Sequence, residues 1–184
     1  ADILHSFQSI RENLEQVELA SWMANLIKAF TAEEIQKPSL FQHLLNCLEA
    51  IEKKNAPGLL PAYFELHLHK YVGYQPKLDR CIRCQGPLGK DECCFLPSAG
   101  GVLCARCGDG SSEPILSPGA VALIQHLLKT DISVLNRLKP SLRQVYEVKE
   151  MLNVYDRYLL EKNVNYGKYN PVKTDDSVRS FSKL

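Results

Sequence analysis

Two pairs of cysteines, each with the spacing C-x2-C, constrain the fold of this 184-residue chain more than any other feature. The pairs are Cys81/Cys84 and Cys104/Cys107, and nineteen residues separate Cys84 from Cys104. In zinc sites of this spacing, each two-residue gap lets one tight turn direct two sulfur atoms at a single metal ion. Four protein ligands leave no coordination position for water or substrate. The pattern therefore predicts one structural Zn²⁺ held by all four cysteines.

The chain contains seven cysteines, so three lie outside these pairs. Cys93 and Cys94 are adjacent and would point to opposite faces of a strand, so they cannot jointly replace a pair. Exchange of Cys94 alone into the metal shell is an open alternative. Cys47 lies in an apolar helical stretch and is expected to be a small core residue. An odd cysteine number with metal spacing indicates a reducing, cytoplasmic environment rather than a disulfide framework.

Apolar periodicity and capping residues predict helices on both sides of the cysteine segment. The expected helices cover residues 9–30 (with a Ser9–Glu12 capping box), about 39–54 (capped by Ser39), about 60–71, a segment starting at Ser117-Pro118, and about 140–162. Between the cysteine pairs, residues 94–96 and 102–103 are expected to form a β-hairpin around the turn 97–101. The predicted fold is mainly α: a helical bundle with an inserted small four-cysteine zinc module that contains a short β-hairpin.

This pattern divides the chain into four segments. The N-terminal helices of the helical domain occupy residues 1–73, and the zinc-ribbon-like module occupies residues 74–108. The C-terminal helices of the same helical domain occupy residues 109–163, and a polar tail, expected to be flexible, occupies residues 164–184.

The net charge argues against a freestanding nucleic-acid-binding protein. The formal net charge is +1, and four thiolates around one Zn²⁺ would bring it to about −1. Nucleic-acid-binding domains usually carry a strongly basic surface, so DNA contact would need a local patch or a part outside this sequence. Candidate DNA-binding residues flank the cysteines, and their simplest role is to neutralise the thiolates: Lys77, Arg80, Arg83 and Arg106.

The sequence contains no recognisable catalytic motif. G-x-x-x-x-G-K-S/T, G-x-S-x-G and H-E-x-x-H are all missing, and neither C-x2-C pair lies beside a βαβ pattern. His67 and His69 are two residues apart on a predicted helix, so they do not face one metal, and packing or surface roles are expected for all five histidines. A non-enzymatic protein is therefore expected. The alternatives are an autonomous zinc-ribbon nucleic-acid-binding module and, less favoured, a thiol or metal enzyme. No apolar run approaches the ~20 residues of a membrane span.

The residues around the cysteines resemble a known family. Residues 71–84 read YVGYQPKLDRCIRC and residues 100–107 read GGVLCARC, and both closely resemble the zinc-bearing form of the bacterial recombination mediator family RecO. The openings LHSF at residues 4–7 and LSPGA at residues 116–120 are similar to its helical segments. The resemblance spans about residues 1–160. The family's N-terminal OB-fold barrel has no counterpart here, and the chain beyond about residue 163 does not follow the family's short ending.

The resemblance implies a non-enzymatic mediator in DNA repair, located in the bacterial cytoplasm at the nucleoid. Such proteins bind single- and double-stranded DNA, anneal complementary strands, pair with RecR and help load RecA. They also engage the acidic C-terminal tail of single-stranded-DNA-binding protein. In this family the barrel supplies much of the DNA and RecR contact, and the helical part is similar to the region that receives the acidic tail. Such a peptide needs an apolar groove between helices with a cation at its rim.

Overall fold

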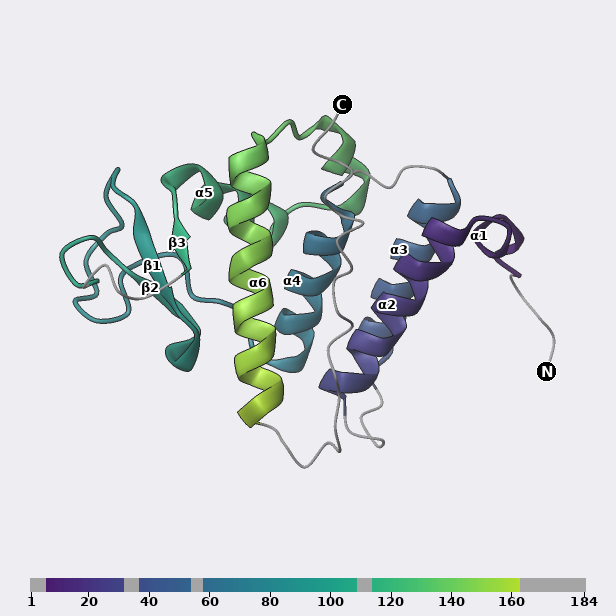
Figure 1. The fold of residues 1–184 in the computed structure, drawn as a ribbon, viewed down its shortest axis with the longest axis horizontal. Coiled ribbons are helices and arrows are strands. Elements are labelled where there is room, and N and C mark those ends of the chain that lie inside the picture. Colours follow the sequence, from purple (N-terminus) through teal and green to yellow (C-terminus); the bar gives the residue numbers. More distant parts are fainter. Residues whose placement is uncertain (1–5, 32–36, 54–57, 109–113, 163–184) are drawn as a thin grey trace.

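Helices form most of the structure, and a small sheet lies at one end. The computed structural model describes residues 6–31, 37–53, 58–108 and 114–162. Four helices pack alongside one another between the sheet at one end and the short α1 (Gln8–Arg11) at the other (Figure 1). They are α2 (Leu14–Phe30), α3 (Pro38–Glu52), α4 (Leu60–Val72) and α6 (Leu142–Lys162). The predicted mainly α class with an inserted cysteine module is confirmed.

The sheet is antiparallel and has the strand order β2-β1-β3. Its strands are β1 (Cys93–Leu96), β2 (Gly101–Leu103) and β3 (Ile115–Leu116). The β1–β2 pair is the predicted hairpin, with Phe95 opposite Val102 across a 3₁₀ turn, η1 (Pro97–Ala99). The third strand was not predicted, because a two-residue segment has no periodicity and forms only by pairing with β1, where Cys93 lies opposite Leu116.

The sheet packs directly on the helices. Phe95 is fully buried, and its ring meets Tyr155 of α6 edge-on at 5.1 Å between centroids. The Tyr155 hydroxyl donates a hydrogen bond to the Tyr74 carbonyl at 3.1 Å, which fixes the point where the chain enters the cysteine segment. After β3 the chain continues through α5 (Pro118–Leu127) and a 3₁₀ helix, η2 (Ile132–Arg137), to α6. The β1 strand is therefore part of the main hydrophobic core.

Most helix ends agree with the sequence signals, but two starts differ. The predicted helix over residues 9–30 is divided, because the Asn13 side chain accepts a hydrogen bond from the Gln16 amide at 3.1 Å and caps α2. Ser9 lies inside α1 rather than at a cap. Helix α3 starts at Pro38, one residue before the predicted cap, because proline fits the first helical position without an amide hydrogen. Ser117 caps α5 as predicted, accepting from the Ala120 amide.

Some predictions fall outside the described residues. These are the tail over residues 164–184, most of the loop after Gly108, and the loop that closes the second helix. Among the helices that the structure describes, none is both long enough and apolar enough to span a membrane.

Candidate metal centre

The structure brings the four paired cysteines into one cluster. One ligand atom from each of Cys81, Cys84, Cys104 and Cys107 lies within 4.8 Å of the others, and the Cys84 and Cys104 sulfurs are 3.9 Å apart. Tetrahedral zinc with Zn–S bonds of about 2.3 Å places its sulfurs about 3.8 Å apart, whereas a disulfide needs about 2.05 Å. The cluster therefore has the size of a metal site.

Two tight turns present the sulfurs. The Gln85 amide donates to the Cys81 carbonyl at 2.9 Å, and the Cys107 and Gly108 amides both donate to the Cys104 carbonyl at 2.9 Å. Each turn thus places the two cysteines of one C-x2-C pair on the same side of the backbone. The sequence spacing predicted this local geometry, and the fold brings the two turns together.

Strand β2 joins the first turn to the second. Lys77 donates its amide to the Gly100 carbonyl at 2.8 Å, and Ile82 donates its amide to the Val102 carbonyl at 2.9 Å. A Cβ on Gly101 would lie 2.5 Å from Ile82 Cγ2 and 3.0 Å from the Lys77 carbonyl oxygen. Gly101 is therefore required by close backbone approach, in addition to its place beside the hairpin turn.

The surroundings of the four thiols favour ionisation of some and oppose ionisation of others. Burial opposes ionisation of Cys81, but hydrogen bonds from the backbone amides of Cys84, Cys104 and Arg83 outweigh it and lower the pKa to about 6. Contact with the Cys84 thiol, followed by burial, raises the pKa of Cys107 to about 12. The cluster thus favours some thiolates while their mutual repulsion opposes a full set, a conflict that a divalent cation resolves.

The other cysteines lie outside this four-sulfur group. Burial raises the pKa of Cys47 to about 12, as expected for a core thiol. Burial, followed by the charge of Cys94, raises the pKa of Cys93 to about 11, and the Cys93 thiol points to the Leu116 carbonyl at 3.7 Å. The Cys94 sulfur is close to Gly108, where an added Cβ would lie 3.0 Å from it. Cys94 is not a member of the group whose ligand atoms meet.

The four basic residues singled out from the sequence are all exposed and lie on the two cysteine turns or in the segment that leads to them. Arg83 donates from Nη1 to the Cys107 carbonyl at 2.6 Å, so it links the second turn to the first. The backbones of Lys77 and Arg80 form isolated β-bridges with Gly101 and Pro87. Their side chains and that of Arg106 face solvent, where they contribute positive charge beside the thiolates.

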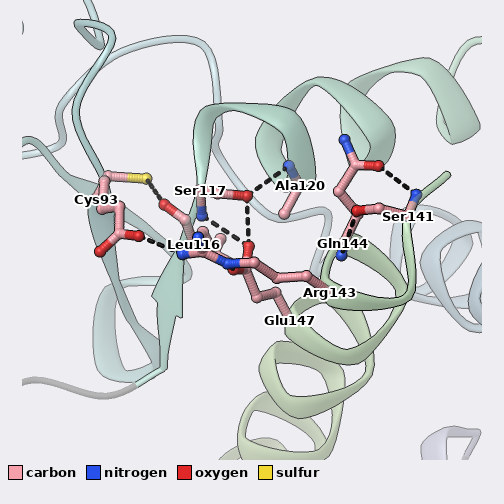
Figure 2. A network of polar contacts seen from close by, with 9 residues as sticks. Cys93, Leu116, Ser117, Ala120, Ser141, Arg143, Gln144 and Glu147 are labelled. Atoms are coloured by element: carbon pink, nitrogen blue, oxygen red, sulfur yellow. Dashed lines mark hydrogen bonds and ion pairs between the residues drawn. The ribbon is translucent and has the colours of Figure 1, made fainter.

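A polar network anchors the cysteine segment to α6 (Figure 2). Glu147 Oε2 accepts hydrogen bonds from the Ser117 amide at 2.8 Å and the Ser117 hydroxyl at 2.6 Å. Glu147 Oε1 accepts from Arg143 Nε at 2.6 Å, and Arg143 also pairs with Glu92, directly before β1. Burial opposes ionisation of Glu147, but the Ser117 and Arg143 contacts outweigh it and lower its pKa. The network joins the start of α5, the start of β1 and α6.

Sequence reasoning placed the histidines in packing or surface roles and missed two buried clusters. His43 stacks on Phe64 at 5.2 Å and on His67 at 5.3 Å between ring centroids. A second cluster joins Glu65 and His69 of α4 to Asp156 of α6. The four-residue spacing of Glu65 and His69 was visible in the sequence, but their partner lies 87 residues beyond His69 and only the fold brings it there.

Comparison with known proteins assigns most of the chain to one family. The family described as "Recombination protein O C terminal" matches residues 11–166. A protein named "DNA repair protein RecO" from Dehalococcoides mccartyi is 31% identical over 159 residues, which cover 86% of this chain and 63% of that protein. Its namesake from Pelotomaculum thermopropionicum is 32% identical over 162 residues, covering 88% and 62%. The one from Desulfitobacterium hafniense is 29% identical over 185 residues, covering 93% and 67%.

The chain spans less than two thirds of the length of the first two of these relatives. The family match covers the helices on both sides of the cysteine segment as well as the segment itself. On this evidence, the chain belongs to the RecO family, in the part that the family describes as its C-terminal region.

Proposed function

We propose that this chain acts in DNA repair as part of a recombination mediator of the RecF-pathway type. It serves as a non-enzymatic adaptor that helps replace single-stranded-DNA-binding protein with RecA and promotes strand annealing. The observation that carries the proposal is the family match over residues 11–166, together with relatives named for DNA repair. For the whole protein we propose contacts with RecR and DNA, mostly through the family's OB-fold part, and a place in the bacterial cytoplasm at the nucleoid.

We propose that the cysteine cluster holds one structural Zn²⁺. The sulfur separation of 3.9 Å matches tetrahedral zinc, and four thiolates would complete its coordination. The metal would supply two positive charges to the cluster and close the two turns on each other. Residues 74–108 would then form the zinc module, with its basic side chains held in fixed positions.

The exposed basic residues of this module are proposed to contact DNA phosphates. Lys77, Arg80 and Arg106 present unburied side chains, whereas Arg83 also braces the second cysteine turn. With a formal net charge of +1, the isolated chain should bind DNA weakly and with a shallow salt dependence. Submicromolar affinity of this chain alone at physiological salt would instead favour the autonomous zinc-ribbon alternative.

A surface recess between α2 and α3 is the proposed site for the tail of single-stranded-DNA-binding protein. It measures about 420 Å³ and is lined mostly by apolar side chains: Ile27, Thr31, Lys37, Pro38, Leu40, Phe41 and Leu44. Phe41 is 68% exposed and offers a ring for aromatic packing. Lys37 is the N-cap residue of α3, and its ammonium group donates one hydrogen bond to the Tyr71 carbonyl at 2.6 Å. The positive charge of that group and the helix N-terminus both favour a carboxylate. This combination suits an acidic peptide with a terminal aromatic residue.

A peptide titration tests this assignment. A fluorescent acidic peptide that ends in phenylalanine should bind the chain, and Phe41→Ala or Lys37→Glu should weaken binding about tenfold or more, since each removes one recognition element. Tyr146→Ala is the matched control, because Tyr146 is 63% exposed on α6 and does not line the recess. Equal affinity of the Phe41 and Tyr146 variants would place the peptide elsewhere, and no binding by the unmodified chain would contradict the partner assignment.

A further inference from the structure

Three potential metal ligands meet inside the helical part, outside the cysteine cluster. Glu65 and His69 are four residues apart on α4 and therefore share one face of that helix. Asp156 projects from α6 toward them. One ligand atom from each lies within 4.8 Å of the other two, and His69 Nε2 is 2.6 Å from Asp156 Oδ1.

The polar atoms of this cluster are poorly satisfied. Glu65 is 7% exposed and its Oε1 has no hydrogen-bond partner, while His69 is fully buried and its Nδ1 has none. Within residues 6–31, 37–53, 58–108 and 114–162, no lysine or arginine forms an ion pair with either carboxylate. Buried carboxylates are normally paired with a cation or coordinated to a metal. The His69 imidazole, which carries charge only when protonated, lies 2.6 Å from Asp156, and among the described residues no other cation pairs with Asp156 and none pairs with Glu65.

The two carboxylates and the imidazole suit a divalent cation that is intermediate between hard and soft, such as Zn²⁺. Carboxylate oxygen and imidazole nitrogen are both ligands of Zn²⁺, at about 2.0–2.2 Å, and a tetrahedral ion places its ligands about 3.3 Å apart. The distance between His69 and Asp156 would increase by less than about 1 Å on binding. The distances from Glu65 to these two residues would decrease by up to about 1.5 Å, which side-chain rotation can provide. One divalent ion would balance two carboxylates.

We propose that Glu65, His69 and Asp156 form a second metal site, which takes a divalent cation of the Zn²⁺ class through nitrogen and oxygen ligands. Asp156 retains 16% side-chain exposure, so the ion enters from its side of α6. The rings of Phe30 and Tyr155 lie 5.3 and 5.2 Å from the imidazole between centroids and hold its orientation. The ion cross-links α4 to α6, a structural role independent of the cysteine site.

A proton is the competing occupant of this cluster. Burial, followed by the neighbouring Asp156 carboxylate, raises the pKa of Glu65 well above its usual range. A proton on Glu65 neutralises one carboxylate, whereas a divalent ion neutralises both. Metal stoichiometry distinguishes these occupants, because the proton predicts one zinc per chain and the second site predicts two.

The test uses the whole chain with its cysteines saturated by Zn²⁺. At micromolar free Zn²⁺, elemental analysis should find two zinc ions per chain, and thermal unfolding should shift upward by several degrees as the second ion binds. Co²⁺ added to the one-zinc form should give weak visible bands without the intense near-ultraviolet absorption of cobalt–thiolate bonds, because the second site contains no sulfur.

Asp156→Asn should abolish the second equivalent and the visible Co²⁺ bands, while Glu161→Gln, which removes an exposed carboxylate from the same helix, should retain both. Glu65→Gln serves as the second variant if Asp156→Asn does not fold. One zinc per unmodified chain, or a second zinc that persists in both cluster variants, would overturn the proposal.

Discussion

Glu147 is the residue whose replacement tests most directly how the start of α5 is held against α6. The Glu147 carboxylate accepts two hydrogen bonds from Ser117 and one from Arg143. In Glu147→Gln, the amide group keeps the shape of the side chain but has no negative charge. Hydrogen bonds to charged groups contribute about 1.5–3 kcal/mol each, and a neutral amide retains part of that. Because Glu147 is only 8% exposed, we expect a loss of about 2 kcal/mol in the free energy of unfolding.

For a chain of this length, a loss of that size corresponds to a fall in Tm of about 4–8 °C. Arg143 is 65% exposed, so its ion pairs are screened and Arg143→Gln should cost less than about 1 kcal/mol. Urea denaturation of the zinc-saturated chain measures both variants. A Glu147→Gln variant within about 0.5 kcal/mol of the unmodified chain would contradict the role assigned to this carboxylate, as would an Arg143→Gln variant that loses as much stability as Glu147→Gln.

Three further predictions concern metal, pH and backbone contact. Strong chelation of the metal, or Cys104→Ser, should unfold the cysteine module before the helices, and chelation should release four thiols together. Structural zinc contributes on the order of 10 kcal/mol to folding, so unchanged thermal stability would contradict a structural zinc site. Burial lowers the pKa of His43 to about 4, so the unfolded chain binds the proton before the folded chain does as pH falls below about 6.5. The free energy of unfolding should therefore drop by about 2 kcal/mol between about pH 6.5 and 5, and by less in His43→Gln. A free energy of unfolding that does not change over this pH range would refute the prediction. Gly101→Ala should destabilise the chain by about 1–3 kcal/mol through its clash with Ile82, whereas Gly58→Ala, with open space around its Cβ position, should stay within about 0.5 kcal/mol in thermal unfolding.

Local chemistry in the sequence was sufficient to predict part of this structure. The C-x2-C spacing predicted two turns, and Ser117 with Pro118 predicted the start of α5. Both are local features, because a helix cap and a cysteine turn depend on residues within a few positions of one another. The division of the first helix was missed because the Asn13 cap and the Ser9–Glu12 capping box compete at nearly the same place. Local signals could not rank two plausible caps.

Features that depend on distant residues were not predictable. Strand β3 is two residues long and exists because Cys93 offers an edge to Leu116 across twenty-two intervening residues. The Glu65, His69 and Asp156 cluster depends on how α6 packs on α4, which no spacing in the sequence encodes. Exposure of the basic residues near the cysteines follows from their positions on the two turns or just before them, and their contact with DNA stays a prediction.

The pairing of β1 with strands on both of its sides has a practical consequence for protein engineering. A graft limited to the cysteines and the loop between them would leave Phe95 without the aromatic ring of α6 and would separate β1 from β3. A segment that can be transferred intact would have to begin at Tyr74, whose carbonyl accepts a hydrogen bond from the Tyr155 hydroxyl of α6. It would have to end at Leu116, which pairs with Cys93 in the sheet. Chimaeras between relatives should therefore place their crossover points outside these two residues.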